Sequence, residues 1–249
     1  MMPPATFTDL DSDLREHHVS DKFAINVSEV LRDIETEHQE TVDRLWQGAL
    51  ASTDNNLFDG TILSVSQITE TAIIVQHSSY RYFYAQQAVP SLFNVLNVRP
   101  LACSGVLHCK DGLVIARRAP DVFLDPGYWE LAPSGTMDSE AVDARGNVDF
   151  SSFLLRELQE ELSIEPKEAH VRGVVGLYEH LHAHGIDIAM EIETKLSATE
   201  VRNRFSAKEN PEYDAIDIVP AHQMDAFIRN LSGQCVGLTT ILVKSLSKA

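Results

Sequence analysis

The sequence predicts an α/β protein, because segments with strand patterns alternate along the chain with segments of helical periodicity. Leu113–Arg118 is typical of a strand, whereas Ser151–Leu162 carries leucines at helical spacing, which indicates an amphipathic helix. The 249 residues are 44% hydrophobic and 23% charged, values typical of a folded globular protein. This length allows one large domain or two small ones.

The charge balance excludes several classes of partner. The net charge of −17 repels polyanions, so we expect no binding to nucleic acid. No apolar run is long enough to span a membrane, and the acidic, polar N-terminus does not resemble a targeting signal. Three cysteines fit a reducing compartment better than a disulfide framework. These features predict a cytoplasmic protein without membrane partners.

The first part of the chain predicts an N-terminal α+β region. Residues 1–20 are polar and prolines occur early, so we expect a flexible tail there. Asn26 has a capping-box spacing to Glu29 and precedes apolar residues at helical spacing up to Trp46, which predicts a long helix. Residues 21–98 then form a helix-plus-sheet region with three expected strands, at Thr61–Val65, Ala72–Gln76 and Tyr80–Ala85.

The second part, residues 99–249, is expected to hold the main α/β domain. A hairpin around Lys110-Asp111-Gly112 begins it, and an irregular loop is expected from Thr136 to about Phe150. The remaining expected strands are Val171–Tyr178, Ile186–Glu193 and Ile216–Val219, and the remaining helices are Ala198–Phe205, His222–Leu231 and a segment after Gly233.

The helix predicted at Ser151–Leu162 carries a carboxylate cluster. Glu157, Glu160 and Glu161 stand at positions i, i+3 and i+4, which places them on one helical face. The leucines of the same helix point to the opposite side. Crowded carboxylates on a packed helix suggest a site for a hard divalent cation such as Mg²⁺. A solvated acidic face is the alternative interpretation of the same three residues.

The context of this helix resembles the Nudix hydrolase family. The run Arg156-Glu157-Leu158-Gln159-Glu160-Glu161 matches the core of the family's signature, and Gly135 precedes it as the signature glycine does. The resemblance implies a Nudix-type α/β/α sandwich with a mixed sheet over residues 99–249. It also implies hydrolysis of a nucleoside diphosphate linked to another group, which yields a nucleoside monophosphate and a phosphorylated product.

The resemblance implies a role for each matched residue. Glu160 and Glu161 correspond to metal ligands, and Glu157 to a residue that ligates metal or acts as the general base. Arg156 corresponds to the arginine that orients the carboxylates, and the backbone at Gly135 supplies a further ligand. A later acidic residue completes the family's metal site. Glu209 is favoured slightly over Glu212 for this position, and a solvated loop acid is the alternative for both. The implied cofactor is Mg²⁺, with Mn²⁺ as the expected substitute.

Two departures from the family pattern affect this region. Gly135 and Arg156 lie 21 positions apart, seven more than in the family, so the loop around Glu140–Asp149 is extended. The family's first motif glutamate therefore has no secure match. The glycine that follows the helix in the family is Ser163 here. Glycine eases a helix end with positive φ, so serine should cost about 1 kcal/mol of stability without affecting catalysis.

Several residues are candidates for substrate binding. Arg117 and Arg118 are expected to hold phosphate oxygens, with a surface pair as the alternative. Tyr128 could stack on a base, and Glu212 is a further candidate. His182 belongs to Glu179–His184, where three histidines could bind a transition metal; substrate contact is the preferred interpretation of this segment.

The N-terminal region gives a finer hint about the substrate. Trp46 and the segment Leu57–Thr61 look like the extension that precedes the fold in Nudix enzymes that cleave UDP-glucose and UDP-galactose. Those enzymes also have a long loop before the catalytic helix. A nucleotide sugar such as UDP-glucose is therefore the expected substrate, and a homodimer remains one open arrangement. The alternative function is a non-catalytic nucleotide-binding or regulatory protein of the same fold.

Overall fold

The computed structural model describes residues 6–9, 13–20, 22–28, 36–52, 57–207, 212–231 and 233–246. The chain divides into two compact units, each formed by three segments. The N-terminal unit comprises Met1–Ala102, Thr136–Phe150 and Glu179–Asp187, and the C-terminal unit comprises Cys103–Gly135, Ser151–Tyr178 and Ile188–Ala249. The chain therefore passes from one unit to the other five times.

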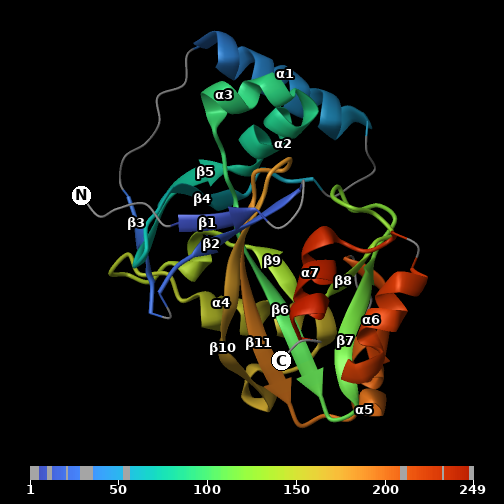
Figure 1. Ribbon diagram of the computed structural model, residues 1–249. Coiled ribbons are helices and arrows are strands. Elements are labelled where there is room, and N and C mark those ends of the chain that lie inside the picture. The colour runs from blue at the N-terminus through green and yellow to red at the C-terminus, as the bar shows by residue number, and fades with distance from the viewer. Residues whose placement is uncertain are drawn as a thin grey trace. The chain divides into compact units, whose positions relative to one another are not determined.

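The C-terminal unit is built on a large sheet. Its strands are β6 (Leu101–Cys109), β7 (Gly112–Arg118), β8 (Trp129–Leu131), β10 (Ala169–His180), β11 (Ile186–Thr194) and β12 (Tyr213–Val219). They follow the order β10-β11-β6-β7-β12, with β8 paired to β7 (Figure 1). β6 and β7 form the predicted hairpin, and β7 also runs antiparallel to β12. All four residues of Leu113–Ala116 are buried, so both faces of β7 are covered.

Four helices accompany this sheet, which confirms the predicted α/β class. They are α4 (Phe150–Leu162), α5 (Ala198–Phe205), α6 (Ala221–Asn230) and α7 (Gly237–Leu246). α5 begins with a capping box, in which the backbone N–H of Ser197 donates to Glu200 Oε2 at 2.7 Å and the backbone N–H of Glu200 donates to Ser197 Oγ at 3.4 Å. In the part of the chain that the structure describes, no helix is long and apolar enough to cross a membrane.

The N-terminal unit has its own small sheet and helices. Its elements are β1 (Thr6–Asp9), β2 (Leu14–His18), β3 (Ala24–Val27), α1 (Thr36–Ser52), β4 (Thr61–Ile68), β5 (Ala72–Ser79), α2 (Tyr80–Ala88) and α3 (Phe93–Leu96). β5 lies between a parallel β3 and an antiparallel β4, and β1 pairs antiparallel with β2. The core of this unit consists of Val42, Ile62, Phe83, Ala85, Leu92, Leu96 and Val98.

Two expectations for the first 50 residues were wrong. The predicted tail contains the strands β1 and β2, and Leu14 anchors β2 because its side chain is buried. The predicted helix start at Asn26 is also wrong, since Asn26 belongs to β3 and pairs with Ile74 of β5. The helix α1 is described over Thr36–Ser52 and includes Trp46 as predicted, and residues 29–35 lie outside the described residues. Apolar residues at positions 25 and 27 suited both periodicities, and pairing with β5 selected the strand.

The strand predicted at Tyr80–Ala85 is the helix α2. Its aromatic residues favour strands by propensity, but this preference depends on what the side chains pack against. Here Tyr80 and Tyr84 both contact the edge of Trp46 on α1, with ring centroids 6.2 and 5.6 Å apart. Tyr80 and Tyr84 are four residues apart, a spacing that presents both rings to one partner only in a helix.

The extended loop before α4 is ordered and belongs to the N-terminal unit. It contains a 3₁₀ helix at Ser139–Ala141, and Met137 is fully buried. The backbone N–H of Leu63 in β4 donates to the carbonyl of Met137 at 2.9 Å. Asp143 closes a tight turn by accepting backbone hydrogen bonds from Arg145 and Asn147. The segment that was expected to be irregular is therefore folded against the strands of the N-terminal region.

Candidate functional site

The helix α4 presents its three glutamates to different environments. Leu154, Leu158 and Leu162 are fully buried, as the periodicity predicted. On the acidic side, the Glu160 side chain is 63% exposed and that of Glu157 only 13%. Glu161 is buried, with a relative exposure of 3%. The face that looked uniform in the sequence therefore grades from solvent at Glu160 to the interior at Glu161.

The structure brings Gly135 and Glu157 together. Gly135 lies in the short strand β9 (Ser134–Thr136). A Cβ atom added to Gly135 would lie 2.6 Å from Glu157 Oε2 and 2.7 Å from Glu157 Cδ. A side chain at position 135 would displace that carboxylate from this position, so the two residues of the signature are in direct contact. Beside them, the backbone N–H of Ser134 points at the Glu161 carboxylate, at 3.2 Å from Oε2.

A buried glutamate that the sequence analysis missed adjoins this pair. Glu130 Oε1 accepts hydrogen bonds from Arg118 Nη1 at 2.5 Å and from Tyr213 OH at 2.9 Å. Ser134 Oγ lies 3.3 Å from the same oxygen. Glu130 sits five residues before Gly135 in a short strand, but its sequence position carried no signal of burial. Its role depends on Arg118 and Tyr213, which come from other strands.

The electrostatics of this cluster are dominated by negative charge. Burial raises the pKa of Glu161 well above its usual range, and the carboxylates of Glu212, Glu157 and Glu130 raise it further. The pKa of Glu212 is also raised, mainly by burial, although Arg118 opposes the shift. A side-chain contact with Glu161 also opposes the raised pKa of Glu212.

Arg118 is the cation held inside the cluster. Its burial opposes its charge, but the carboxylate of Glu130 holds its pKa above the usual value. Burial likewise raises the pKa of the Tyr213 hydroxyl, and the charge of Glu130 adds to the shift. Tyr213 therefore remains a neutral hydrogen-bond donor. Arg118 inside the cluster and Arg156 beside Glu157 are fewer than the four carboxylates of Glu130, Glu157, Glu161 and Glu212, which leaves an excess of negative charge.

The donor chemistry of the cluster suits a hard divalent cation. Carboxylate and backbone oxygens are the ligands that Mg²⁺ and Mn²⁺ prefer, and a bound cation would offset the repulsion that raises the pKa of Glu161. Within the described ranges, however, no three acidic, histidine or cysteine side chains already converge as a ligand set. Glu209, the favoured late ligand, lies outside the described residues, whereas Glu212 belongs to the cluster.

The arginine of the signature lies on the surface side of the helix. Arg156 Nη2 is 3.9 Å from Glu157 Oε1, and Arg156 Nε is 3.8 Å from Glu160 Oε1. Its guanidinium also lies 5.0 Å from the centre of the Phe153 ring. Arg156 thus contacts both neighbouring glutamates, in keeping with the orienting role that the resemblance implies.

Arg117 and Arg118, the two arginines expected to bind phosphate, each contact protein groups in this structure. Arg117 forms a bidentate ion pair with Asp214, with distances of 2.7 and 3.0 Å, which matches the surface-pair alternative. Arg118 is committed to Glu130 and to the carbonyl of Leu124. Tyr128 is exposed, at 39%. His182 belongs to the N-terminal unit, where its Nε2 lies 3.0 Å from Asp13 Oδ1.

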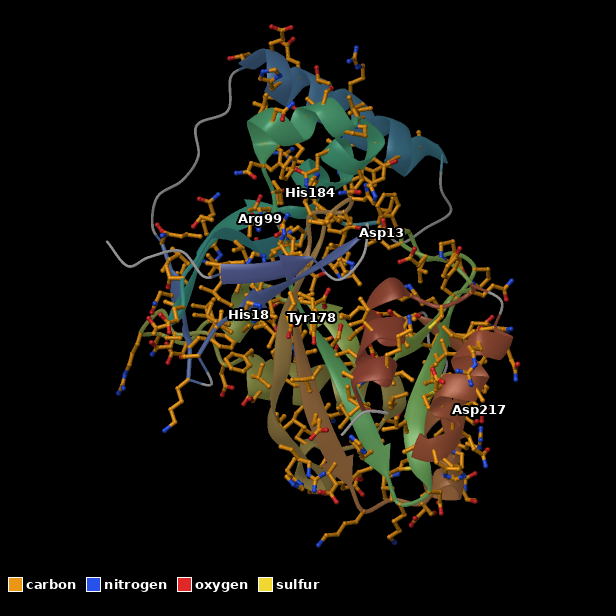
Figure 2. The ribbon with its side chains drawn as sticks, in the orientation of Figure 1. Asp13, His18, Arg99, Tyr178, His184 and Asp217 are labelled. Carbon is orange, nitrogen blue, oxygen red and sulfur yellow. The ribbon has the colours of Figure 1, made fainter. Side chains whose placement is uncertain are left out.

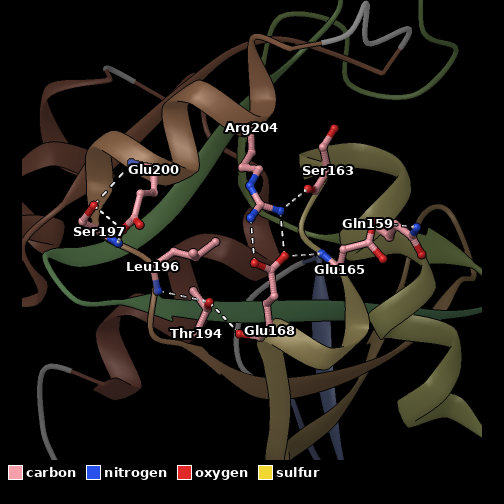
Figure 3. Close-up of polar contacts among 9 residues, drawn as sticks. All are labelled: Gln159, Ser163, Glu165, Glu168, Thr194, Leu196, Ser197, Glu200 and Arg204. Atoms are coloured by element: carbon pink, nitrogen blue, oxygen red, sulfur yellow. Dashed lines mark hydrogen bonds and ion pairs between the residues drawn. The ribbon is translucent and has the colours of Figure 1, made fainter.

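The C-terminal end of α4 is held by an arginine from α5 (Figure 3). Arg204 donates to both carboxylate oxygens of Glu168 at 2.6 Å and to the carbonyl of Ser163 at 3.1 Å. A cation at this position compensates the unpaired carbonyls of the helix end. Ser163 itself has φ = 55°, so the left-handed conformation expected where the family has glycine is confirmed.

The N-terminal unit contains a second buried glutamate, Glu179, in the hairpin Glu179–Asp187 that carries three histidines. Glu179 lies 2.8 Å from His17, 2.9 Å from Arg99 and 3.6 Å from Arg15. Burial alone would raise the pKa of Glu179, but the hydrogen bond from His17 and the charge of Arg99 prevail and hold it at about 2. In the same hairpin, the His184 ring stacks on Phe93 with centroids 3.5 Å apart; Figure 2 labels Arg99 and His184.

The histidines of this hairpin are already engaged by protein groups. His180 Nε2 lies 2.7 Å from Asp187 Oδ2, and Gln87 donates to the carbonyl of Ala183 at 3.0 Å. The absence of a converging ligand set holds here as well, for the part of the chain that the structure describes. The hairpin tip is therefore held within its own unit by one side-chain pair and one hydrogen bond to its backbone.

Comparison with known proteins gives fold likenesses only. No family model and no curated protein matches the sequence. The MutT protein from Methanosarcina mazei is 13% identical over 60% of this chain and 94% of its own, with a TM-score of 0.44. The Nudix hydrolase RenU from M. smegmatis is 14% identical over 60% of this chain and 84% of its own (TM-score 0.42). The Nudix domain of Shewanella oneidensis NrtR, solved with ADP-ribose, is 17% identical over 61% and 88% (TM-score 0.39). At these values the likenesses carry no argument about the reaction.

Proposed function

We propose that this chain is a divalent-cation-dependent pyrophosphohydrolase of the Nudix type. Its substrate would be a nucleoside diphosphate linked to a second group, and its products a nucleoside monophosphate and a phosphorylated second group. The observation that carries this proposal is the packing of the Glu157 carboxylate against Gly135, beside the buried Glu161. Gly135 thereby meets the glutamates of α4, although it lies 22 positions before Glu157 in the sequence.

The protein's residues would divide the work as follows. Glu161, Glu157 and Glu212 would hold the cation, together with Glu160 and the backbone at Gly135. A bound Mg²⁺ supplies positive charge for the diphosphate oxygens and makes an attacking water more acidic. Glu157 takes the proton of that water at its carboxylate. The water oxygen forms a bond to phosphorus, the bridging P–O bond breaks, and the leaving phosphate departs as an anion.

The neighbouring residues would keep these groups in position. Arg156 lies within 4 Å of Glu157 and Glu160 and limits their movement. Arg118 and Tyr213 neutralise and orient Glu130, so that this carboxylate does not displace Glu161. Ser134 presents its backbone N–H to Glu161. These contacts fix the carboxylates before substrate arrives, which is the condition for efficient proton transfer.

The finer assignments also remain proposals. The nucleotide sugar, with UDP-glucose as its representative, rests on the N-terminal extension and the long loop between Gly135 and α4. We further propose residues 99–249 as the catalytic domain, residues 21–98 as a substrate lid or dimer surface, Mn²⁺ as a substitute for Mg²⁺, and a cytoplasmic location.

One observation favours a second candidate, a non-catalytic nucleotide-binding or regulatory protein. In the described part of the chain, the carboxylates do not yet converge as a ligand set. Such a protein would bind nucleotide diphosphates without hydrolysing them. The retention of Glu157 in contact with Gly135 argues for the enzyme, since binding alone requires no base.

The deciding experiment measures monophosphate release from a panel with Mg²⁺, with Mn²⁺ and with EDTA. The panel holds UDP-glucose, GDP-mannose, ADP-ribose, dinucleoside polyphosphates and the (d)NTPs. Cation-dependent turnover of one class supports the enzyme and identifies its substrate. Cation-dependent binding without turnover of any member supports the regulatory candidate. A folded protein with neither response contradicts both.

A further inference from the structure

The loop between β7 and β8 exposes an unusual concentration of large apolar side chains. Phe123, Leu124 and Tyr128 are 39%, 38% and 39% exposed. Among the described residues only Leu50 and Phe58 are other large hydrophobic residues with such exposure, and both lie in the N-terminal unit. A concentration of exposed apolar groups on one loop of a protein with a net charge of −17 indicates a binding surface.

Hydrogen bonds fix the backbone of this loop while its apolar side chains remain exposed. The backbone N–H groups of Gly127 and Arg118 donate to the carbonyls of Arg118 and Tyr128, at 3.0 and 2.9 Å. The backbone N–H of Tyr128 closes a turn onto the carbonyl of Asp125 at 3.1 Å. Arg118 Nε holds the carbonyl of Leu124 at 2.8 Å. The apolar side chains are therefore presented by a backbone that is fixed before any ligand binds.

The same loop is attached at both of its ends to the carboxylate cluster. The guanidinium of Arg118 that holds Leu124 also donates to Glu130. The backbone N–H of Ala119 donates to the carbonyl of Glu212 at 2.7 Å. At the other end, Glu130 follows Tyr128 by two residues. A ligand whose phosphates lie at the carboxylates would therefore have its remaining part next to this loop.

The charges of the loop select which part of the ligand it accepts. Asp121 and Asp125 are exposed and negative, and Arg118 is already paired, so phosphate groups are disfavoured there. An uncharged aromatic ring is favoured, because an exposed tyrosine offers a face for stacking and a carboxylate can accept N–H groups.

We propose that the loop 119–128 receives the nucleobase of the substrate, which stacks on Tyr128. This inference rests on the proposed function and assigns the base-binding part of that site. It predicts that binding energy comes from two separable regions, the carboxylates with their cation for the diphosphate and Tyr128 for the base.

The test compares two kinds of non-hydrolysable probe by isothermal titration calorimetry in Mg²⁺. α,β-Methylene-ADP and α,β-methylene-UDP carry a base, whereas methylenediphosphonate is the corresponding diphosphate without one. Tyr128→Ala should weaken binding of the base-carrying probes about tenfold or more. It should leave binding of methylenediphosphonate within twofold. Tyr128→Phe keeps the ring and should bind like the wild type. Lys195→Ala truncates an exposed side chain to which no role is assigned and serves as the control.

The outcomes separate this inference from the proposed function. An equal loss of affinity for both kinds of probe, or no loss for either, would overturn the assignment of the base to Tyr128. The proposed diphosphate site would not be contradicted, because the wild type would still bind the probes. A wild-type protein that binds neither kind of probe in Mg²⁺ would overturn the proposed function as well. A loss on Tyr128→Phe as large as on Tyr128→Ala would assign the effect to the hydroxyl and contradict stacking.

Discussion

Glu161 and Glu179 are both buried glutamates, with 3% and 9% exposure, but their surroundings are opposite. Glu179 in the N-terminal unit faces Arg15, Arg99 and His17, and its pKa is held at about 2. Glu161 in the C-terminal unit faces other carboxylates, and its pKa lies well above the usual range. Positive neighbours favour the charged form of Glu179, whereas the negative neighbours of Glu161 disfavour its charged form, a perturbation that is concentrated at functional sites.

The two glutamates indicate different uses of buried charge in this chain. The segment Glu179–His184 was a candidate site in the sequence because it contains three histidines, but Glu179 and His180 are paired with protein groups in the structure. The cluster around Glu161 holds more carboxylates than arginines, and it coincides with the signature helix. This excess of carboxylates, more than the number of titratable groups, supports the proposed site.

The largest expected effect is on turnover and concerns Glu157 in the carboxylate cluster. Glu157→Gln keeps the size of the side chain that packs against Gly135 but removes the proton acceptor. Turnover should fall by on the order of 10² to 10⁴, the usual contribution of a general base. Steady-state kinetics on the best panel substrate measures this loss. Glu193→Gln, which changes a half-buried glutamate on β11 that pairs with Arg172, is the control. Full turnover by Glu157→Gln would refute the assigned role.

The next largest effect is on stability and concerns Glu179 in the N-terminal unit. Glu179→Gln leaves two arginines and His17 without their carboxylate and should destabilise the protein by about 2 kcal/mol, after allowance for partial exposure. Thermal unfolding at pH 7 measures this loss. The folded-state pKa of Glu179 is depressed, so its contribution is present above about 4.5 and is lost as pH falls towards 2. The difference between wild type and variant should shrink over that range, and a difference independent of pH would contradict the charge-based explanation.

The same substitution at Glu161 should have the opposite sign. Without metal, Glu161→Gln removes a carboxylate that burial and its neighbours disfavour, so stability at pH 7 to 8 should rise by about 1 kcal/mol. The sign follows because the folded-state pKa of Glu161 is raised, so the wild type loses stability as pH increases. Added Mg²⁺ should then stabilise the wild type and have little effect on the variant. A lower melting temperature in EDTA would show that Glu161 is satisfied like Glu179.

The smallest effect is expected at the end of the signature helix. Ser163 has positive φ, and its buried Oγ has no hydrogen-bond partner among the described residues. Ser163→Gly relieves both defects and should stabilise the protein by about 0.5 to 1 kcal/mol. Ser163→Ala keeps the Cβ and removes only the hydroxyl, so it should gain less. Equal stability for the two variants would show that backbone strain contributes nothing.

Local patterns predicted the site best where the chemistry is local. The leucine spacing of α4 predicted its extent to within one residue at its start, and Gly135 was correctly linked to the glutamate helix. Glu130 was missed because its partner Tyr213 is 83 residues away, and no local pattern reports such a contact. The ion pair of Arg117 with Asp214 was missed for the same reason, since Asp214 comes from β12, far along the chain.

In the N-terminal region, propensity was a weaker guide. Asn26 combined a capping-box spacing with apolar residues and still formed a strand, because β5 offered it backbone partners. Tyr80 and Tyr84 had strand propensity and formed a helix, because Trp46 offered a common contact. In both cases the deciding partner lay outside the local window.

The ordered loop before α4 has a consequence for how this protein can be divided. Gly135 and Glu157 belong to the C-terminal unit, but the segment between them is folded onto β4 of the N-terminal unit through Met137. A clone that starts at residue 99 would keep every residue of the signature and lose the strand that supports the link between its two halves. The segment Thr136–Phe150 would then lack the backbone donor of Leu63, so a division of the chain at residue 99 cuts through one folded unit.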